Sequence, residues 1–266
     1  MTARTRKRLT PVGILAAAAL IAASPQPVAA QEGIPTRVVV RAVSNDAKII
    51  GSGVGGARVM IRDALTGRIL ASGTQEGGTG DTGAIMGSRD RAAAVFDTDG
   101  AGRFEATLRL SAPTQVVVEA EGPLGAEHAL QTASTTLLLV PGHDVVGNGV
   151  VLTLHGFTVE MVEAPASAAP GSTVEVVSRI TMLCGCPTEP GGMWDSDRYV
   201  LQVALVSGDR VRAEAPLEFS GERSVYRGSL EIPSDISTGD YALRIVAVDG
   251  ERANAGMVLQ PIRIDG

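Results

Sequence analysis

The chain has 266 residues and a formal net charge of -6, and only 3% of its residues are aromatic. This length allows one large or two ordinary domains. The acidic balance argues against nucleic acid and anionic membrane surfaces as partners, because both are bound through basic patches.

Residues 1–30 have the three parts of a secretory signal peptide. Four basic residues precede an apolar stretch at 14–23, and residues 28–30 form a small-residue cleavage site. The apolar stretch is shorter than the ~20 residues that a bilayer span needs, and no cysteine lies near the cleavage site to carry a lipid. Cleavage removes four of the 23 basic residues and none of the 29 acidic ones, which leaves a formal charge of -10. We expect a periplasmic or secreted protein with no membrane span and no lipid anchor.

The remaining sequence has the pattern of an all-β protein. Short runs rich in Val, Ile, Leu and Thr are broken by Gly, Pro, Asn and Asp, and helical periodicity is nearly absent. We predict two tandem β-sandwich domains, at residues 31–157 and 158–266. The Ala- and Pro-rich stretch 164–171 opens the second.

In the first domain, turn residues separate the predicted strands. Thr66-Gly67 and Asp99-Gly100 supply residues that tolerate a left-handed backbone, which tight hairpins need. The glycine-rich loop 75–91 is too long for a routine hairpin, so it is either functional or mobile. The expected strands lie at 36–43, 57–63, 69–74, 92–96, 103–110, 115–121, 132–140 and 150–154.

Four runs in this domain carry a family resemblance. GARVMIRD at 56–63, TG at 66–67, ASGT at 71–74 and DTDGAGRF at 97–104 resemble the carboxypeptidase regulatory-like domain, a prealbumin-like sandwich. The resemblance covers roughly residues 36–122. It implies a non-catalytic accessory or binding module and nominates no catalytic residue.

The second domain contains strands that alternate between apolar and polar residues. In the run 173–182, Val174, Val176, Ile180 and Met182 share one face, which predicts a half-buried strand. The runs 199–205 and 241–245 repeat this pattern. The run STGDYAL at 237–243 resembles the penultimate strand of bacterial immunoglobulin-like or fibronectin-like modules, in which Tyr241 would contact the preceding loop.

The segment 182–194 gathers the rarest side chains of the protein. It holds Cys184 and Cys186, the only cysteines, together with Met182, Met193 and the only tryptophan, Trp194. Continuing the strand phase turns Met182 and Cys184 inward, and Cys186 too if the chain stays extended. If the sequence holds a chemical site, this segment is the first candidate.

A disulfide between the two cysteines requires a bend. Residues two apart in a strand have Cα atoms about 6.6 Å apart, at the outer limit for a disulfide, and Gly185 permits the chain to bend. Closing so short a loop constrains the unfolded chain by only ~1.6 kcal/mol. Stability alone is therefore a weak reason for the pair.

Three interpretations of the segment remain open. A disulfide or two buried thiols could shape the end of the strand, with Trp194 packed over them as core. Alternatively, Cys184 and Cys186 with the thioethers of Met182 and Met193 could bind Cu(I), with Trp194 shielding the ion. Thiol-disulfide exchange is the third, although a thioredoxin-like context is missing.

No complete catalytic motif is found. GSGVGG at 51–56 matches a dinucleotide fingerprint but leads into a strand rather than a helix. His128, His143 and His155 lie in no nucleophile or metalloprotease arrangement. We therefore expect a non-catalytic exported protein that binds or scaffolds a protein partner in the cell envelope, with periplasmic copper handling or thiol redox chemistry as the alternative.

Overall fold

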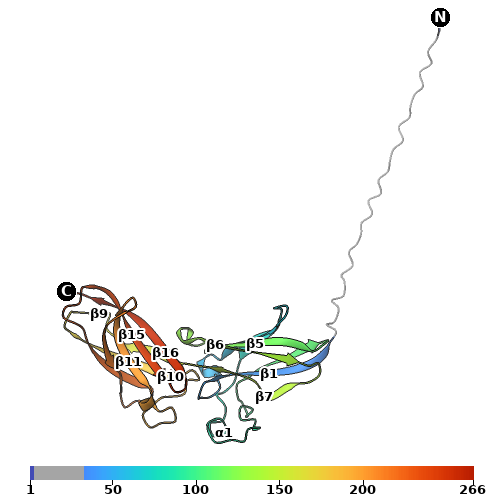
Figure 1. Ribbon diagram of the computed structural model, residues 1–266, viewed down its shortest axis with the longest axis horizontal. Helices are drawn as coiled ribbons and strands as arrows, with labels where there is room; N and C mark the ends of the chain where they lie inside the picture. The colour runs from blue at the N-terminus through green and yellow to red at the C-terminus, as the bar shows by residue number, and fades with distance from the viewer. Residues whose placement is uncertain (3–32) are drawn as a thin grey trace. The chain divides into compact units, whose positions relative to one another are not determined.

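The computed structural model describes residues 1–2 and 33–266 (Figure 1). The predicted signal peptide therefore lies, except for its first two residues, outside the described part, and its assignment stays a prediction. Glu32–Gly266 forms one compact unit. Among the described residues, no helix is both long enough and apolar enough to cross a membrane.

The described part of the chain is built almost wholly of strands, as the sequence predicts. The strands are β1 (Ile34–Ser44), β2 (Ala57–Asp63), β3 (Ile69–Gln75), β4 (Phe104–Leu110), β5 (Thr114–Gly122), β6 (Gln131–Leu139), β7 (Val145–Leu154), β8 (Phe157–Glu163), β9 (Ser167–Ala168), β10 (Thr173–Met182), β11 (Val200–Ser207), β12 (Arg210–Pro216), β13 (Glu218–Phe219), β14 (Val225–Glu231), β15 (Gly239–Asp249) and β16 (Asn254–Ile264). The short helical segments are η1 (Ser52–Val54), α1 (Thr82–Met86), η2 (Glu127–Ala129) and η3 (Ser196–Arg198).

Two sheets from the first half of the chain enclose one core. Their strand orders are β4-β1-β7 and β3-β2-β5-β6, and only the β1-β7 pair is parallel. Alternate residues point inward, so Val38 and Val40 of β1 meet Val116 and Val118 of β5 in one buried cluster. We call this unit the first sandwich.

Two sheets from the second half enclose another core. Their orders are β13-β14-β10-β8 and β12-β11-β15-β16-β9. Val174 and Val176 of β10 face Val203 of β11 and Ile245 of β15 in this core. We call this unit the second sandwich. The all-β fold class with sandwich architecture is thus confirmed, and the division into two separate domains at residue 157 stays a prediction.

Most predicted strands are present, with ends shifted by a few residues. The strand predicted at 92–96 is wrong, because this segment forms turns. Its apolar residues serve a different purpose: Val95 is buried, and the Asn148 side chain holds the backbone of Ala93 and Phe96. The sequence reading also missed β8, which begins at Phe157 and pairs with β10.

The long glycine-rich loop packs against the first sandwich. It contains α1, which Asp81 caps by accepting a hydrogen bond from the Ala84 amide at 2.7 Å. Ile85 is buried against Ile49 in a small apolar cluster. Just beyond the loop, Asp97 pairs at 2.7 Å with Arg41, whose side chain is fully buried. The loop and the residues after it therefore cover the outer side of β1.

Tyr241 makes the contact expected of it. Its hydroxyl donates a hydrogen bond to the backbone oxygen of Ser237, 2.9 Å away in the loop before β15. This arrangement resembles the tyrosine corner of immunoglobulin-like sandwiches.

Gln75 links β3 to the opposite sheet of the first sandwich. Its side chain is fully buried and makes three hydrogen bonds. Its oxygen accepts from the Ala42 amide at 2.7 Å, and its nitrogen donates to the oxygens of Ala42 and Ile50 at 2.9 and 2.8 Å. Its amide thus satisfies backbone groups that have no access to water.

We expect Gln75→Met to destabilise the protein by about 2–4 kcal/mol, because buried backbone groups would lose their partners. Chemical denaturation measures this change. The matched control is Gln115→Met on the exposed side of β5, which should change the free energy of unfolding by less than about 0.5 kcal/mol. Equal effects at the two positions would contradict the role given to Gln75.

Candidate functional site

The cysteine segment forms a tight turn at the end of β10. The Gly185 amide donates to the Met182 oxygen at 2.8 Å, and the Met182 amide donates to the Cys186 oxygen at 3.0 Å. Gly185 has a φ of +76°, in the left-handed region that favours glycine. The Cα atoms of Cys184 and Cys186 are 5.4 Å apart, which a disulfide can span, and their sulfur atoms are in direct contact. The predicted bend is therefore present.

The inward phase predicted for this segment is also present. Met182, Cys184 and Cys186 are at most 5% exposed and belong to the core of the second sandwich. Leu183 is fully buried as well, but it packs into the core of the first sandwich. Side chains along the turn thus serve two cores.

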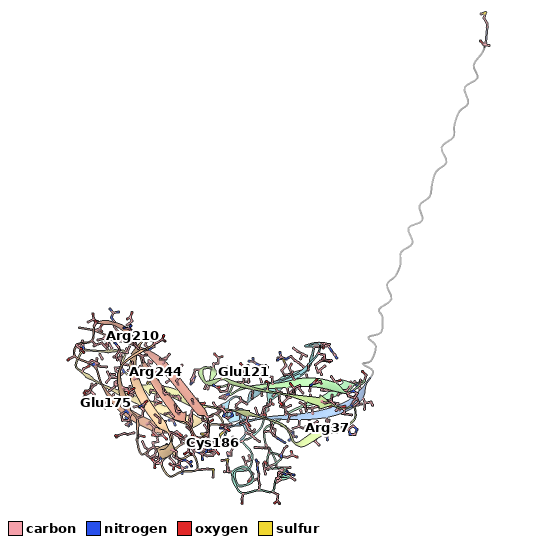
Figure 2. All side chains as sticks on the ribbon, in the orientation of Figure 1. Arg37, Glu121, Glu175, Cys186, Arg210 and Arg244 are labelled. Atoms are coloured by element: carbon pink, nitrogen blue, oxygen red, sulfur yellow. A yellow bond between two sulfur atoms is a disulfide. The ribbon has the colours of Figure 1, made fainter. Side chains whose placement is uncertain are left out.

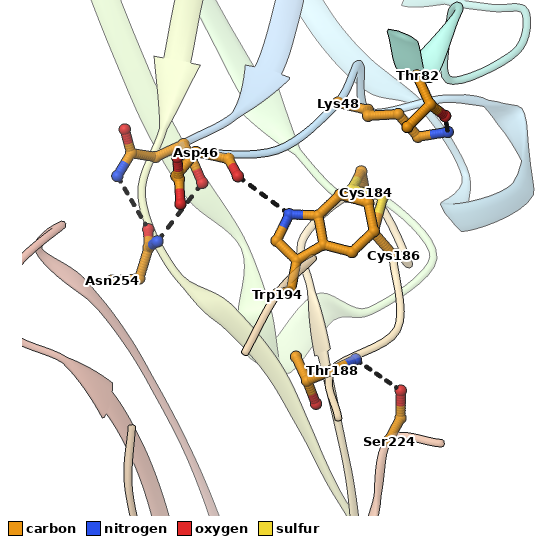
Figure 3. Close-up of a disulfide and its surroundings, with 10 residues drawn as sticks. Asp46, Lys48, Thr82, Cys184, Cys186, Thr188, Trp194, Ser224 and Asn254 are labelled. Carbon is orange, nitrogen blue, oxygen red and sulfur yellow. Dashed lines mark hydrogen bonds between the residues drawn. A yellow bond between two sulfur atoms is a disulfide. The ribbon is translucent and has the colours of Figure 1, made fainter. Parts of the chain in front are cut away.

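Trp194 and Met193 behave differently from each other. Trp194 is buried in the second core, and its indole nitrogen donates to the Asp46 oxygen at 3.0 Å (Figure 3). Met193 is 59% exposed. Both side chains nevertheless line one open depression of about 370 Å³ together with Cys184 and Cys186. Met182 is not among the residues that line it.

Charged side chains frame this depression. The Lys48 ammonium donates to the Thr82 hydroxyl at 2.9 Å, and the Arg223 guanidinium pairs with Glu189 at 3.0 Å. Within residues 33–266, no three His, Cys, Asp or Glu side chains are grouped to hold a metal ion. Any metal here would depend on the two cysteines and on methionine sulfur.

A buried hydrogen-bond network positions the chain after the turn. The Thr188 hydroxyl donates to the Ile180 oxygen at 2.7 Å and shares a hydrogen bond of 2.8 Å with the Tyr226 hydroxyl. The Thr188 amide donates to the Ser224 hydroxyl at 3.1 Å (Figure 3). Burial raises the pKa of Tyr226, so this hydroxyl keeps its proton. The network fixes the segment that leads to Trp194.

The same region joins the two sandwiches by an exchange of side chains. Ala47, between β1 and β2, packs into the core of the second sandwich. In return, Leu183 packs into the core of the first. A side chain added at Gly185 would lie 2.9 Å from Val54 of the first sandwich. We call these contacts, with the polar ones of the next paragraph, the joint.

Polar groups complete the joint. The Asn45 side chain donates to the Arg252 oxygen at 2.6 Å and to the side-chain oxygen of Asn254 at 3.3 Å. Asn254 is buried and also accepts from the Gly156 amide at 3.0 Å. The Arg252 guanidinium pairs with Asp46 at 2.6 Å. The sequence reading missed all these residues, because polar residues in turns carry no signal of a distant partner.

The three histidines do not come together at this region or elsewhere. His128 lies in η2, His143 in the turn before β7 and His155 between β7 and β8, and each is exposed. This agrees with the sequence, in which they lie in no nucleophile or metalloprotease arrangement.

Comparisons with known proteins give no family. No protein-family model matches the chain, and no curated protein matches it. Among solved structures, domains 4 and 5 of the S-layer protein SbsC match 60% of this chain and 69% of that one, at 12% identity and a TM-score of 0.27. A marsupial T cell receptor matches 87% of this chain and 72% of that one, at 10% identity and a TM-score of 0.28.

A third similar structure is a glucan-utilisation protein from Bacteroides ovatus, SGBP-B, in complex with a mixed-linkage heptasaccharide. The match covers 93% of this chain but 46% of that one, at 16% identity and a TM-score of 0.23. Identities and TM-scores this low do not bear on the function of the chain. Its all-β class rests on its own sheets.

Tyr199 gives the joint region a pH dependence. Its ring lies 4.9 Å from that of Phe157, and burial raises its pKa to about 12, with the charges of Asp249 and Asp46 adding to the effect. The unfolded-state pKa of tyrosine is about 10. The stabilisation from the neutral phenol is therefore fully present below pH 10 and is lost as the pH rises towards 12.

We expect the free energy of unfolding of the wild type to fall more steeply between pH 10 and 12 than that of Tyr199→Phe. Denaturant unfolding at fixed pH values measures this, and ultraviolet absorbance of tyrosinate gives the pKa. Parallel pH profiles for the two proteins, or a Tyr199 pKa near 10, would refute the assignment.

Proposed function

We propose that the chain is a non-catalytic exported protein of the cell envelope, in which two interlocked β-sandwiches form a scaffold that holds a protein partner. The observation that carries the proposal is the reciprocal packing of Ala47 and Leu183. Because each side chain completes the core of the other sandwich, separating the sandwiches would expose apolar surface on both. A stiff connection of this kind suits a protein that presents surfaces in a fixed arrangement.

The sequence resemblances support this proposal. A carboxypeptidase regulatory-like first sandwich and an immunoglobulin-like second sandwich are modules that bind or support other proteins. Gly67 in the hairpin between β2 and β3 and Gly100 in the turn before β4 have left-handed φ angles, as the turn residues predict. The hydrogen bond from Tyr241 to Ser237 supports the second assignment. The predicted signal peptide supports export to the periplasm or beyond.

In this function, Cys184 and Cys186 form a disulfide with a structural role. An exported protein meets an oxidising environment, in which such bonds persist. The link holds a turn whose two sides serve different cores, with Leu183 on one side and the cysteines on the other. The disulfide contributes mainly by holding the shape of the joint, because closing a three-residue loop removes little conformational entropy from the unfolded chain.

The scaffold proposal predicts that the two sandwiches unfold together. Trp194 fluorescence reports on the joint and far-ultraviolet circular dichroism on all strands, so the two probes should give one coincident transition in denaturant. Leu183→Ala should destabilise the protein by about 2–5 kcal/mol. It should also separate the two transitions, because it removes a contact between the sandwiches.

The control is Leu230→Ala, since Leu230 is equally buried but lies wholly in the second core. It should lower stability by a similar amount and leave the transitions coincident. Separate transitions in the wild type would contradict an interlocked scaffold.

Cu(I) binding is the second candidate function, and one observation favours it. Cys184, Cys186 and Met193 line the same open depression, and all three offer the soft sulfur ligands that Cu(I) prefers. Binding requires that an external dithiol first donates two electrons and two protons to the disulfide, giving two thiols. Each thiol then releases its proton as it binds the metal. Met182 lies behind the cysteines in the core, and Trp194 would shield the ion.

After reduction, anaerobic titration with Cu(I) in competition with a chelator tests this candidate. The wild type should bind one equivalent at least about 10-fold more tightly than a variant with both Cys184→Ser and Cys186→Ser. Met193→Leu should weaken binding, whereas Met257→Leu, at an equally exposed methionine outside the depression, should not. Equal binding by wild type and double variant eliminates the copper function.

A further inference from the structure

The outer face of one sheet in the second sandwich is apolar. Paired residues of β11, β15 and β16 show which side chains share this face. Of the fourteen that these three strands contribute, ten are apolar, and the one acid, Asp240, pairs with the neighbouring Arg263 at 3.2 Å. They are Val200, Gln202, Ala204, Val206, Asp240, Ala242, Arg244, Val246, Val248, Ala255, Met257, Leu259, Pro261 and Arg263.

This face differs from the outer faces of the other sheets. On the opposite sheet of the same sandwich, β10 presents Thr173, Glu175 and Arg179 to solvent. In the first sandwich, the outer face of β2 and β5 carries two ion pairs, Arg58 with Glu121 and Arg62 with Glu119. Antiparallel sheets with one solvated face normally show this polar pattern. An apolar outer face indicates a sheet that is covered on both sides.

Within the described structure, three large side chains of β11 and β16 on this face remain exposed, while Ala204 and Val206 of β11 are buried. Val200 is 54%, Met257 55% and Leu259 52% exposed. The residues on this face come from three adjacent strands, so they form a continuous surface rather than scattered single residues. Surfaces of this kind mark sites of interaction.

Arg244 lies within this face, directly opposite Leu259 on β16 and Ala204 on β11 (Figure 2). Its Nε atom is buried and has no hydrogen-bond partner among residues 33–266. The described residues also contain no ion pair of Arg244. A guanidinium among apolar side chains with a buried, unsatisfied N–H is costly unless a carboxylate or another acceptor reaches it.

These observations define the chemistry of the occupant. An anionic membrane would need a cluster of basic residues, but the face carries two, and one of them, Arg263, pairs with Asp240. The charge and the apolar surroundings together favour a different protein, with an apolar surface that contains a carboxylate.

We propose that the outer face of β11, β15 and β16 is the docking site for a partner protein, whose apolar surface covers Met257 and Leu259 and whose Asp or Glu side chain pairs with Arg244. This inference rests on the proposed binding and scaffolding function and names the surface that performs it. Apolar contact provides the affinity, and the buried ion pair selects the partner.

Site-specific photo-crosslinking in the cells that produce the protein tests this inference. The full chain carries p-benzoylphenylalanine in place of Leu259 or, as the control, in place of exposed Thr173 on β10 of the opposite sheet. We expect one discrete heterologous adduct from position 259 and none from position 173. Arg244→Gln should lower the adduct yield at least about 10-fold, while its unfolding midpoint in denaturant should stay that of the wild type.

The crosslinked partner, identified by mass spectrometry and purified, provides the decisive measurement. Arg244→Glu should abolish binding, and exchanging the partner's contacting acid for arginine should restore it. Adducts of the chain with itself or with lipid, no adduct at 259, or binding that Arg244→Gln leaves unchanged would each overturn the docking site. The scaffold function would survive these outcomes if the two sandwiches still unfold together, so the two proposals fail separately.

Discussion

The exchange of Ala47 and Leu183 between the two cores is the contact on which the rest of the arrangement depends. Ala47 follows β1 of the first sandwich but is buried in the core of the second. Leu183 follows β10 of the second sandwich but is buried in the core of the first. Their positions explain why the loop after β1 and the turn after β10 must keep defined shapes. The polar contacts of Asn45, Arg252 and Asn254 then close the joint around them.

The turn of Cys184, Gly185 and Cys186 follows from this constraint. Met182 and the cysteines face one core while Leu183 faces the other, and the chain reverses here, because the Met182 amide donates to the Cys186 oxygen. Gly185 permits the left-handed backbone and also leaves room for Val54. A bond between the sulfurs would hold the reversal. The two cysteines are thus explained by the shape of the turn, and they need not contribute much to the stability of the protein.

Sequence patterns predicted local structure well where the residues of a single strand or turn contain the whole signal. The alternation in β10 identified its buried residues and the phase of Met182 and Cys184, and Thr66-Gly67 identified the hairpin between β2 and β3. The prediction at 92–96 failed because Val95 is buried within a segment of turns, which a local apolar pattern cannot distinguish from a strand. Similarly, β8 was missed because it crosses the expected domain boundary between residues 157 and 158.

The joint and the apolar face were harder to predict for different reasons. The joint depends on contacts of residues 45–47 with residues of the second half of the chain, such as Arg252 and Asn254. No local sequence pattern links two segments so far apart. The apolar face does leave a trace in the sequence, since VLQVALV at 200–206 is apolar at nearly every position. Such a run indicates burial on both faces, and Ala204 and Val206 are buried, whereas Val200 at the start of the run is 54% exposed. Only the register of β11, β15 and β16 shows which side chains of the neighbouring strands share its outer face.

The distance between the two sandwiches tests the interlocked joint most directly. Spin labels carried by unnatural amino acids at exposed Thr107 on β4 and Thr173 on β10 leave Cys184 and Cys186 intact. Double electron-electron resonance should then give a single narrow distance distribution for the wild type and a broad one for Leu183→Ala. A broad distribution in the wild type would show that the sandwiches move independently and would contradict the account.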